Sequence, residues 1–389
     1  MQLPAANRCL SCPNSWERKS NRTMSEFSAA DCEYMARALR LARLGLYTAH
    51  PNPRVGCVLV KNDSIIGEGW HRKTGEAHAE VNALADTDGN ASGATAYVTL
   101  EPCSHHGRTP PCSSALIDAG VAEVVVAMVD PNPKVSGSGI AALEAAGIKV
   151  RAGLMGADAL RLNEGFCSRV SRARPWVKLK VAASLDGCTS MANGESQWIT
   201  GKEARADVQR LRAASGAIMV GIGTVLADDP SLTVRDENIG NDGRQPLRVV
   251  LDSELRMPSS AHMLGLPGDT VVFCQHDKER AALERAGAKV SVVAGSGGKV
   301  DLAAVLEQLA GLEINDLLVE AGQILTGSLL MAGLVDELVI YQAPHIMGSE
   351  TRGMFATPNW QELQQKLALN VIDVRQVGVD SRITLRPVS

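Results

Sequence analysis

The sequence has no surplus of basic residues. Its 389 residues include 39 lysines and arginines against 43 aspartates and glutamates, which gives a formal net charge of −4. Proteins dedicated to nucleic-acid binding usually carry a basic surplus, so the composition argues against this class. The sequence also lacks an apolar run of the roughly 20 residues needed to cross a bilayer. We therefore expect neither a nucleic-acid partner nor a membrane partner.

A secretory signal is missing as well. Residues 1–23 are polar and contain no apolar core of the kind that such a signal needs, and we expect residues 1–24 to form a disordered extension. The nine cysteines are an odd number at scattered positions. In a chain without a secretory signal this favours reduced thiols and a cytoplasmic location.

The rest of the chain is too long for one compact core, and two domains are expected. Residues 171–175, Ser-Arg-Ala-Arg-Pro, have the composition of a linker. We therefore predict a first domain over residues 25–170 and a second over residues 176–389. In the first, predicted strands alternate with predicted helices, which indicates a three-layer α/β/α sandwich.

The stretch from His78 to Cys112 contains the residues that most clearly indicate a chemical function. One imidazole and two thiols, from His78, Cys103 and Cys112, suit a zinc ion whose fourth position is left to water. Such a water needs a proton shuttle. Glu80 is the candidate, because a carboxylate serves this purpose when water attacks an amidine-like carbon and ammonia leaves.

This pattern resembles the signature of the zinc-dependent nucleobase deaminases, with one departure. The common form is Pro-Cys-x-x-Cys, whereas eight residues separate Cys103 from Cys112 here. The alternative interpretation is that the two cysteines fill core space and the histidine is an ordinary surface or core residue. We expect a strand over residues 95–100 to end beside Cys103, and a helix over residues 113–119 to begin at Cys112. A thiolate at a helix N-terminus is stabilised by the unpaired N–H groups there, which favours the metal site.

Two polar positions near this stretch are candidates for substrate contacts. Asn52 lies between two prolines; its amide suits a ribose hydroxyl or a pyrimidine edge, and the alternative is ordinary turn chemistry. His105 belongs to a polar loop over residues 104–110, which is either a solvated loop or a collar over the metal pocket that binds a phosphorylated sugar.

The second half reads as further strands and helices, and one turn stands out. A predicted strand over residues 317–319 runs through a glycine-containing turn, residues 320–328, into a helix. Backbone N–H groups exposed at such a helix start suit a phosphate or pyrophosphate; the alternative is a helix entry without a ligand. No Gly-x-Gly-x-x-Gly fingerprint follows a predicted strand, so a dinucleotide would bind on a scaffold other than the Rossmann fold.

Several motifs in both halves are those of one family. They are Thr99-Leu100-Glu101-Pro102-Cys103-Ser104-His105-His106-Gly107-Arg108-Thr109-Pro110-Pro111-Cys112, Ser184-Leu185-Asp186-Gly187, Gly194-Glu195-Ser196-Gln197-Trp198-Ile199-Thr200, Ala227-Asp228-Asp229-Pro230 and Val319-Glu320-Ala321-Gly322. With them, roughly residues 29–389 resemble the bifunctional deaminase/reductase of riboflavin biosynthesis. The wide cysteine spacing is a property of that family and so supports the resemblance.

This resemblance implies a cytidine-deaminase-like domain followed by a dihydrofolate-reductase-like α/β domain. The first would hold one zinc ion and hydrolytically deaminate 2,5-diamino-6-ribosylamino-4(3H)-pyrimidinone 5′-phosphate, with Glu80 as the catalytic residue. The second would use NADPH to reduce the ribosyl group to a ribityl chain. The resemblance further implies a homo-oligomer that forms through the reductase domain.

The resemblance also implies the contacts in the second domain. Cofactor contacts would be Ala182, Trp198, Thr224, Asp228, Ser253, Gly322, Gln323, Ile324, Leu325, Thr326, Gly327 and Ser328. Substrate contacts would be Ser196, Arg212, Leu232, Arg235 and Glu320. Arginines suit a substrate phosphate, but the spacing alone does not say which of the two takes that role.

Three other functions are weighed against this one. A deaminase that edits RNA has the same zinc motif, but the acidic net charge and the second half speak against it. A scaffold protein with structural zinc would need no glutamate at position 80. A second domain that only forms dimer contacts would need neither the turn at Glu320 nor the arginines.

Overall fold

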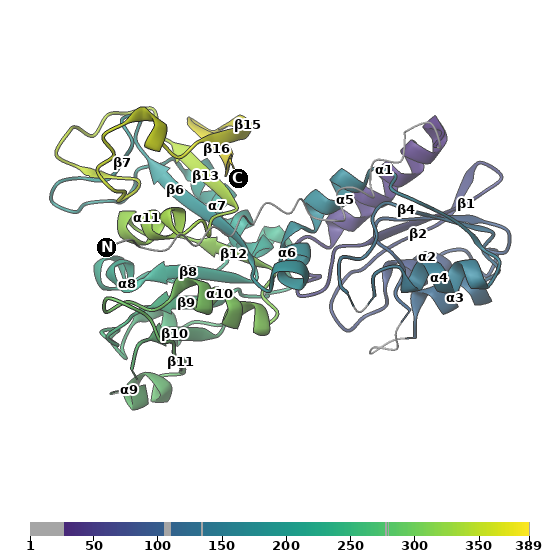
Figure 1. Cartoon of the computed structure of the whole chain (residues 1–389), viewed down its shortest axis with the longest axis horizontal. Helices are drawn as coiled ribbons and strands as arrows, with labels where there is room; N and C mark the ends of the chain where they lie inside the picture. Colours follow the sequence, from purple (N-terminus) through teal and green to yellow (C-terminus); the bar gives the residue numbers. More distant parts are fainter. Residues whose placement is uncertain (1–26, 105–109, 134, 277, 279, 389) are drawn as a thin grey trace, which may run out of the picture. The chain divides into compact units, whose positions relative to one another are not determined.

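The computed structural model describes residues 27–104, 110–133, 135–276, 278 and 280–388 (Figure 1). The chain forms two compact units. One holds Arg54–Asn163 with the residues up to Gly45, and the other holds Leu46–Pro53 and Glu164–Ser389. The predicted extension over residues 1–24 lies outside the described residues. None of the helices in the described ranges combines the length and the apolar character that a bilayer crossing requires.

The first unit is a five-stranded sheet with helices on both faces, as the sequence predicts. The strand order is β2-β1-β3-β4-β5, and Figure 1 shows α1 and α5 on one face and α2, α3 and α4 on the other. The elements are α1 (Ala29–Leu44), β1 (Gly56–Lys61), β2 (Ser64–Trp70), α2 (Ala79–Ala85), β3 (Thr95–Val98), α3 (Cys112–Asp118), β4 (Glu123–Val126), α4 (Ser138–Ala145), β5 (Lys149–Ala152) and α5 (Gly156–Leu162).

Local sequence explains how these layers form. Ser28 caps α1 by accepting the Asp31 N–H at 3.1 Å. Gly69 lets β2 lie directly against α2, because a Cβ there would come within 2.3 Å of the Ala79 carbonyl oxygen. This contact positions the first turn of α2.

The second unit is built on a nine-stranded sheet. Its order is β11-β10-β9-β8-β12-β6-β13-β16-β15. In this order the strands from β11 to β13 run parallel to one another. Strand β16 is antiparallel to β13, and β15 is antiparallel to β16. The elements are α6 (Glu164–Arg172), β6 (Trp176–Ala183), β7 (Cys188–Ser190), α7 (Lys202–Ala214), β8 (Ala217–Gly221), α8 (Ile222–Asp228), β9 (Leu247–Leu251), β10 (Thr270–Cys274), α9 (Arg280–Arg285), β11 (Ala288–Val292), α10 (Leu302–Gly311), β12 (Asp316–Val319), α11 (Gln323–Met331), β13 (Glu337–Gln342), β14 (Arg352–Gly353), β15 (Leu369–Val377) and β16 (Asp380–Pro387).

Two buried clusters form the core of this unit. One includes Val177, Leu179 and Leu317, and the other includes Ile218, Val220 and Leu318. Leu317 and Leu318 are neighbours in β12 and belong to different clusters, because successive side chains of a strand point to opposite faces. The central, parallel strands of the sheet are therefore buried on both faces, as parallel sheets usually are.

The compact units divide the chain at a different point from the predicted boundary at residue 170. The Asn163 side chain bonds to both the N–H and the carbonyl of Arg54 in the first unit, at 2.8 and 2.9 Å. Glu164 pairs with Arg386 in the second unit at 2.7 Å. These partners, far away in sequence, place the division between Asn163 and Glu164.

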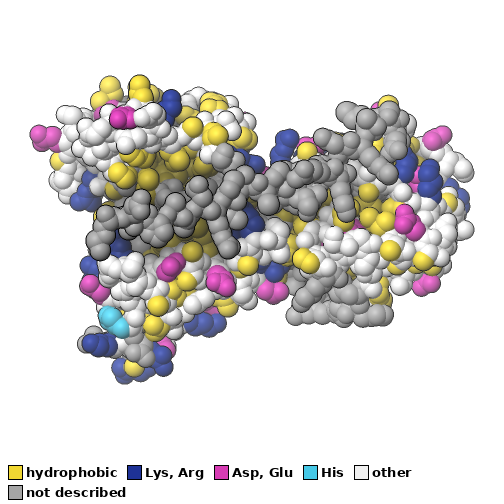
Figure 2. Space-filling model, viewed as in Figure 1, with side chains coloured by type: hydrophobic (Ala, Val, Ile, Leu, Met, Phe, Trp, Pro, Cys, Tyr) yellow, Lys and Arg dark blue, Asp and Glu magenta, His cyan; other side chains and the backbone are white. Residues whose placement is uncertain are grey.

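Charges of both signs are mixed on the surface. On the described part of the face in Figure 2, Lys and Arg side chains are interspersed with Asp and Glu side chains. This distribution fits the slightly acidic composition.

Candidate metal centre and cofactor groove

The zinc-type stretch folds so that its residues meet at the starts of two helices. His78 is the N-cap of α2, and Glu80 lies in the first turn of that helix. Cys103 follows β3 by a few residues, and Cys112 is the first residue of α3. The Cys112 N–H donates to the Cys103 sulfur at 3.3 Å, so the two cysteines lie next to each other although eight residues separate them in the sequence.

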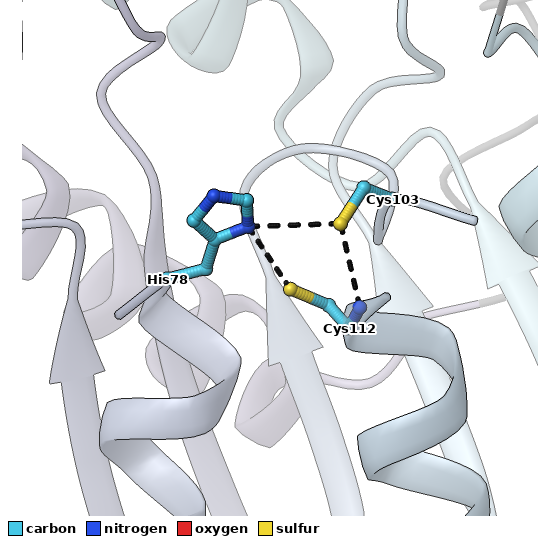
Figure 3. Close-up of side chains that lie close together, drawn as sticks. All are labelled: His78, Cys103 and Cys112. Atoms are coloured by element: carbon cyan, nitrogen blue, oxygen red, sulfur yellow. Dashed lines mark hydrogen bonds between the residues drawn. The ribbon is translucent and has the colours of Figure 1, made fainter. Parts of the chain in front are cut away.

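The three predicted ligands come together in one small site (Figure 3). The ligand atoms of His78, Cys103 and Cys112 all lie within 4.8 Å of one another. His78 Nδ1 is 3.1 Å from the Cys112 sulfur and 3.6 Å from the Cys103 sulfur. In a tetrahedral zinc site, a nitrogen and a sulfur ligand lie about 3.5 Å apart. The donor set and its spacing therefore fit zinc with one position left over.

The charges in this site suit a metal and an acid–base group. Hydrogen bonds from Cys112 and His78 lower the pKa of Cys103 to about 4, against the opposing effect of burial. Burial, and next the negative charge of Cys103, raise the pKa of Glu80 to about 7. Glu80 is therefore a buried carboxyl group in the first turn of the helix that His78 caps, and its pKa is raised toward neutral pH, as proton transfer requires.

A second buried glutamate, Glu101, has a different role. Its two carboxylate oxygens accept four hydrogen bonds of 2.9–3.2 Å. The donors are the backbone N–H groups of Asp130, Gly137, Gly139 and Ile140. Because Glu101 precedes Pro102 and Cys103, these bonds hold the backbone that leads to a ligand. Glu101 belongs to one of the family motifs, but its role could not be predicted from the sequence.

His71 is a further residue that the sequence analysis missed. Its side chain is buried, its ring lies edge-on to the His78 ring with centroids 5.3 Å apart, and its Nδ1 is 3.2 Å from the Ala77 carbonyl oxygen. It thus holds the residue before a ligand. In the sequence, only its position seven residues before His78 could have indicated a role next to the metal site.

The second unit contains a groove of about 1200 Å³. All five substrate residues that were predicted for the second domain line it. The predicted cofactor residues that line it are Ala182, Trp198, Thr224, Asp228, Ser253, Gly322, Gln323, Ile324, Leu325 and Ser328. The groove thus joins segments that lie as much as 172 positions apart in the sequence, between Lys180 and Arg352.

Thr326 and Gly327 are not among the groove residues. The Thr326 hydroxyl donates to the Met354 carbonyl at 2.8 Å, and a Cβ at Gly327 would lie 2.0 Å from the Ala356 carbonyl oxygen. Both residues lie on the face of α11 that packs against residues 354–356. The groove instead meets the beginning of α11, where free backbone N–H groups suit a pyrophosphate.

A cluster of charged side chains, Lys180, Arg212 and Glu320, lines this groove. Arg212 donates to both oxygens of Glu320, at 2.7 and 3.1 Å, and the Lys180 ammonium lies 3.7 Å from the same carboxylate. Burial alone would raise the pKa of Glu320, but the two cations lower it to about 2. Lys180 was not predicted from the sequence; a lysine in a buried strand is the signal that could have identified it.

Two predicted substrate contacts of the deaminase half remain predictions. His105 lies outside the described residues. Asn52 belongs to the segment Leu46–Pro53, which is grouped with the second unit. There its N–H donates to the Ala49 carbonyl at 2.8 Å, as a turn residue would.

Both halves of the chain match known protein families. Residues 175–382 match the RibD C-terminal domain, and residues 28–128 match the cytidine and deoxycytidylate deaminase zinc-binding region. Two curated relatives are named riboflavin biosynthesis protein RibD. The one from Escherichia coli K12 is 49% identical over 356 residues, which cover 89% of this chain and 96% of the relative. The one from Haemophilus influenzae is 46% identical over 373 residues, covering 94% and 99%.

Solved structures agree over nearly the whole chain. RibD from Acinetobacter baumannii is 45% identical, with a TM-score of 0.87 over 92% of this chain and 99% of that one. A Thermotoga maritima protein, described as a diaminohydroxyphosphoribosylaminopyrimidine deaminase/5-amino-6-(5-phosphoribosylamino)uracil reductase, is 32% identical, with a TM-score of 0.82 over the same shares. The predicted fold of both domains is confirmed.

Proposed function

This chain belongs to the RibD family, whose members are bifunctional deaminases and reductases of riboflavin biosynthesis, and on this premise we propose its substrate and site residues. The substrate is 2,5-diamino-6-ribosylamino-4(3H)-pyrimidinone 5′-phosphate. The first unit exchanges its 2-amino group for oxygen and releases ammonia. The second unit then reduces the ribosyl group to a ribityl chain.

For the first step, His78, Cys103 and Cys112 hold the zinc ion. Zinc at this site supplies an activated water molecule for hydrolysis. The Glu80 carboxylate accepts a proton from the attacking water and delivers it to the departing amino group, so that water is consumed and ammonia leaves. Asn52 and His105 contact the substrate. The observation that carries this assignment is the buried Glu80 carboxyl group, which lies in the first turn of the helix capped by His78, one of three converging ligand residues.

For the second step, the groove of the second unit holds cofactor and substrate side by side. NADPH supplies the hydride. The backbone N–H groups at the beginning of α11 bind its pyrophosphate, and the other predicted cofactor residues line the same groove. Glu320 keeps the guanidinium of Arg212 in place, so that Arg212 and Arg235 can bind the anionic substrate. The deaminase thus lies in the predicted domain 25–170 and the reductase in the predicted domain 176–389.

The test separates the two activities. Zinc-loaded protein is incubated with the diaminopyrimidinone ribotide, and ammonia release is followed without NADPH; NADPH is then added and its oxidation is followed. We expect ammonia first and oxidation second. Ammonia without later oxidation would contradict the reductase step, and the absence of both with zinc bound would contradict the proposed substrate.

We further propose that two copies associate through β15, the edge strand of the large sheet. Its apolar residues Val371, Ile372 and Val374 are 63%, 52% and 61% exposed, and an exposed apolar edge strand is prone to pair with another chain. Antiparallel pairing of two copies centred on Val374 would place Asp373 of each copy opposite Arg375 of the other.

A charged substitution tests this interface. Val374→Arg places two like charges opposite each other and should convert the oligomer to smaller species in sedimentation velocity. Val292→Arg, at the opposite edge of the sheet and 45% exposed, is the control and should have no effect. Unchanged assembly of the Val374→Arg protein would refute the interface.

We also propose a cytoplasmic location. None of the seven cysteines in the described ranges forms a disulfide, which supports this location.

A further inference from the structure

The loop that leads into the metal site is closed by one side chain of α2. Residues 71–77 connect the end of β2 at Trp70 to His78, the first of the three proposed ligands. The Asn82 amide nitrogen donates to the Trp70 carbonyl oxygen at 2.9 Å and to the Ala77 carbonyl oxygen at 3.2 Å. These acceptors lie at the two ends of the loop, so a single amide group holds both ends on the same helix.

The two bonds need the two N–H groups of an amide. Backbone carbonyl oxygens only accept hydrogen bonds, so each of them needs a donor from the side chain at position 82. The NH₂ group of asparagine has two donors, and each carbonyl takes one. A leucine at this position would have nearly the same shape but no donor. The chemistry of Asn82 therefore matches the task of closing the loop.

The Ala77 carbonyl is the point at which the loop is held next to the ligand. Besides Asn82, the ring of His71 contacts this oxygen, with Nδ1 3.2 Å away. The His71 N–H in turn donates to the Val55 carbonyl at 2.9 Å. Because the peptide unit between Ala77 and His78 is planar, the direction of this carbonyl fixes the position of the His78 Cα. The bonds to the Ala77 carbonyl thus determine where the His78 side chain begins.

Helix α2 is joined to β2 at its other end by a bond that does not involve the loop. Asp86 is the C-cap of α2, and its Oδ2 accepts the Glu68 N–H at 2.9 Å. Asn82 and Asp86 lie one helical turn apart, and both connect α2 to β2. Asn82 also reaches Ala77, next to the ligand. The two side chains share a structural task, and one of them has a second contact at the metal site.

We propose that Asn82 is a positioning residue of the deaminase site. By closing the loop over residues 71–77, it holds the His78 imidazole where its Nδ1 lies 3.1 and 3.6 Å from the two cysteine sulfurs. Loss of a group that orients a metal ligand typically weakens metal binding roughly 10- to 100-fold. This inference rests on the proposed zinc site. Asn82 itself is not a ligand and acts through the backbone that precedes His78.

Zinc binding by the full-length protein tests this inference without turnover. Zinc-free protein is titrated with zinc in competition with a chromophoric chelator, which gives the dissociation constant. Asn82→Ala should raise this constant about 10-fold. Asn82→Leu, which keeps the shape and loses both donors, is the second variant and should have the same effect. Asp86→Ala, which removes only the bond to β2, is the matched control and should leave the constant unchanged.

Cobalt(II) separates positioning from a general loss of stability. When cobalt replaces zinc, its visible spectrum reports the geometry of the ligands. The bands should shift in both Asn82 variants and stay in place in Asp86→Ala, even where the unfolding midpoints of all three fall by similar amounts. Unchanged zinc affinity and cobalt bands in a folded Asn82 variant would overturn the inference, as would equal changes in Asp86→Ala. A wild-type protein that binds no zinc would contradict the proposed metal site itself, and the inference with it.

Discussion

Replacement of Glu80 by glutamine is the sharpest test of the deaminase site. Glutamine has nearly the same shape, but its amide neither accepts a proton from water nor delivers one to an amino group. Removal of a positioned acid–base group typically lowers a rate by about 10²- to 10⁴-fold. We expect a loss of this size in ammonia release from the Glu80→Gln protein.

The structure explains why no neighbour should compensate. Glu101, the other buried glutamate near the ligands, has both carboxylate oxygens occupied by four backbone N–H donors. Glu80 is 3% exposed, so bulk water does not readily replace its carboxylate. The loss should therefore lie toward the upper part of the range.

The assay measures ammonia release together with zinc content. Glu80→Gln should retain zinc, because the ligands are untouched, and should still oxidise NADPH when supplied with the deaminated product. Glu76→Gln changes an exposed residue just before α2 and should leave ammonia release unchanged. If Glu80→Gln keeps more than a tenth of the wild-type kcat with zinc bound, the assigned proton shuttle is wrong.

Three further predictions follow from other contacts. Removal of zinc with a chelator should stop ammonia release and leave oxidation of NADPH with the deaminated product intact; equal loss of both would contradict the separation of the two sites. Glu101→Gln should destabilise the first unit by about 2 kcal/mol or more, because the amide NH₂ faces backbone donors, and urea unfolding against Glu76→Gln measures this. Burial alone would raise the pKa of Asp31, but Arg151, Tyr97 and Ser28 hold it below its usual range. Its carboxylate therefore stabilises the fold above the unfolded pKa of about 3.9 and loses this effect as the pH falls below it. Asp31→Asn should flatten the loss of stability as the pH falls below about 4, and an unchanged pH profile would contradict the assignment.

Much of the deaminase site was predictable because its key pair is local. His78 and Glu80 lie two residues apart, so the start of a single helix places both. The spacing of Cys103 and Cys112 in the sequence is wider than in the common deaminase motif. In the structure a hydrogen bond from the Cys112 N–H to the Cys103 sulfur nevertheless brings the two residues together. The predicted fold, function and cofactors are confirmed by the family matches of both halves and by the relatives.

The boundary between the units was less predictable. The apolar pattern indicates one helix over residues 157–170, whereas the chain forms α5 and α6 with a break at Asn163. The helical period continues through the break, so the pattern does not reveal it. The break depends on the bonds from Asn163 to Arg54, which is 109 positions away in the sequence.

The sequence by itself determined the chemistry of this protein: a His-Cys-Cys set with a glutamate, and a glycine turn that leads into a helix. Only the tertiary structure decided what surrounds these groups. The donors to Glu101 and the charge cluster at Glu320 both join residues more than 25 positions apart. Such contacts follow from the order and register of strands in a sheet, which are set by long-range packing and leave no periodic signal in the sequence.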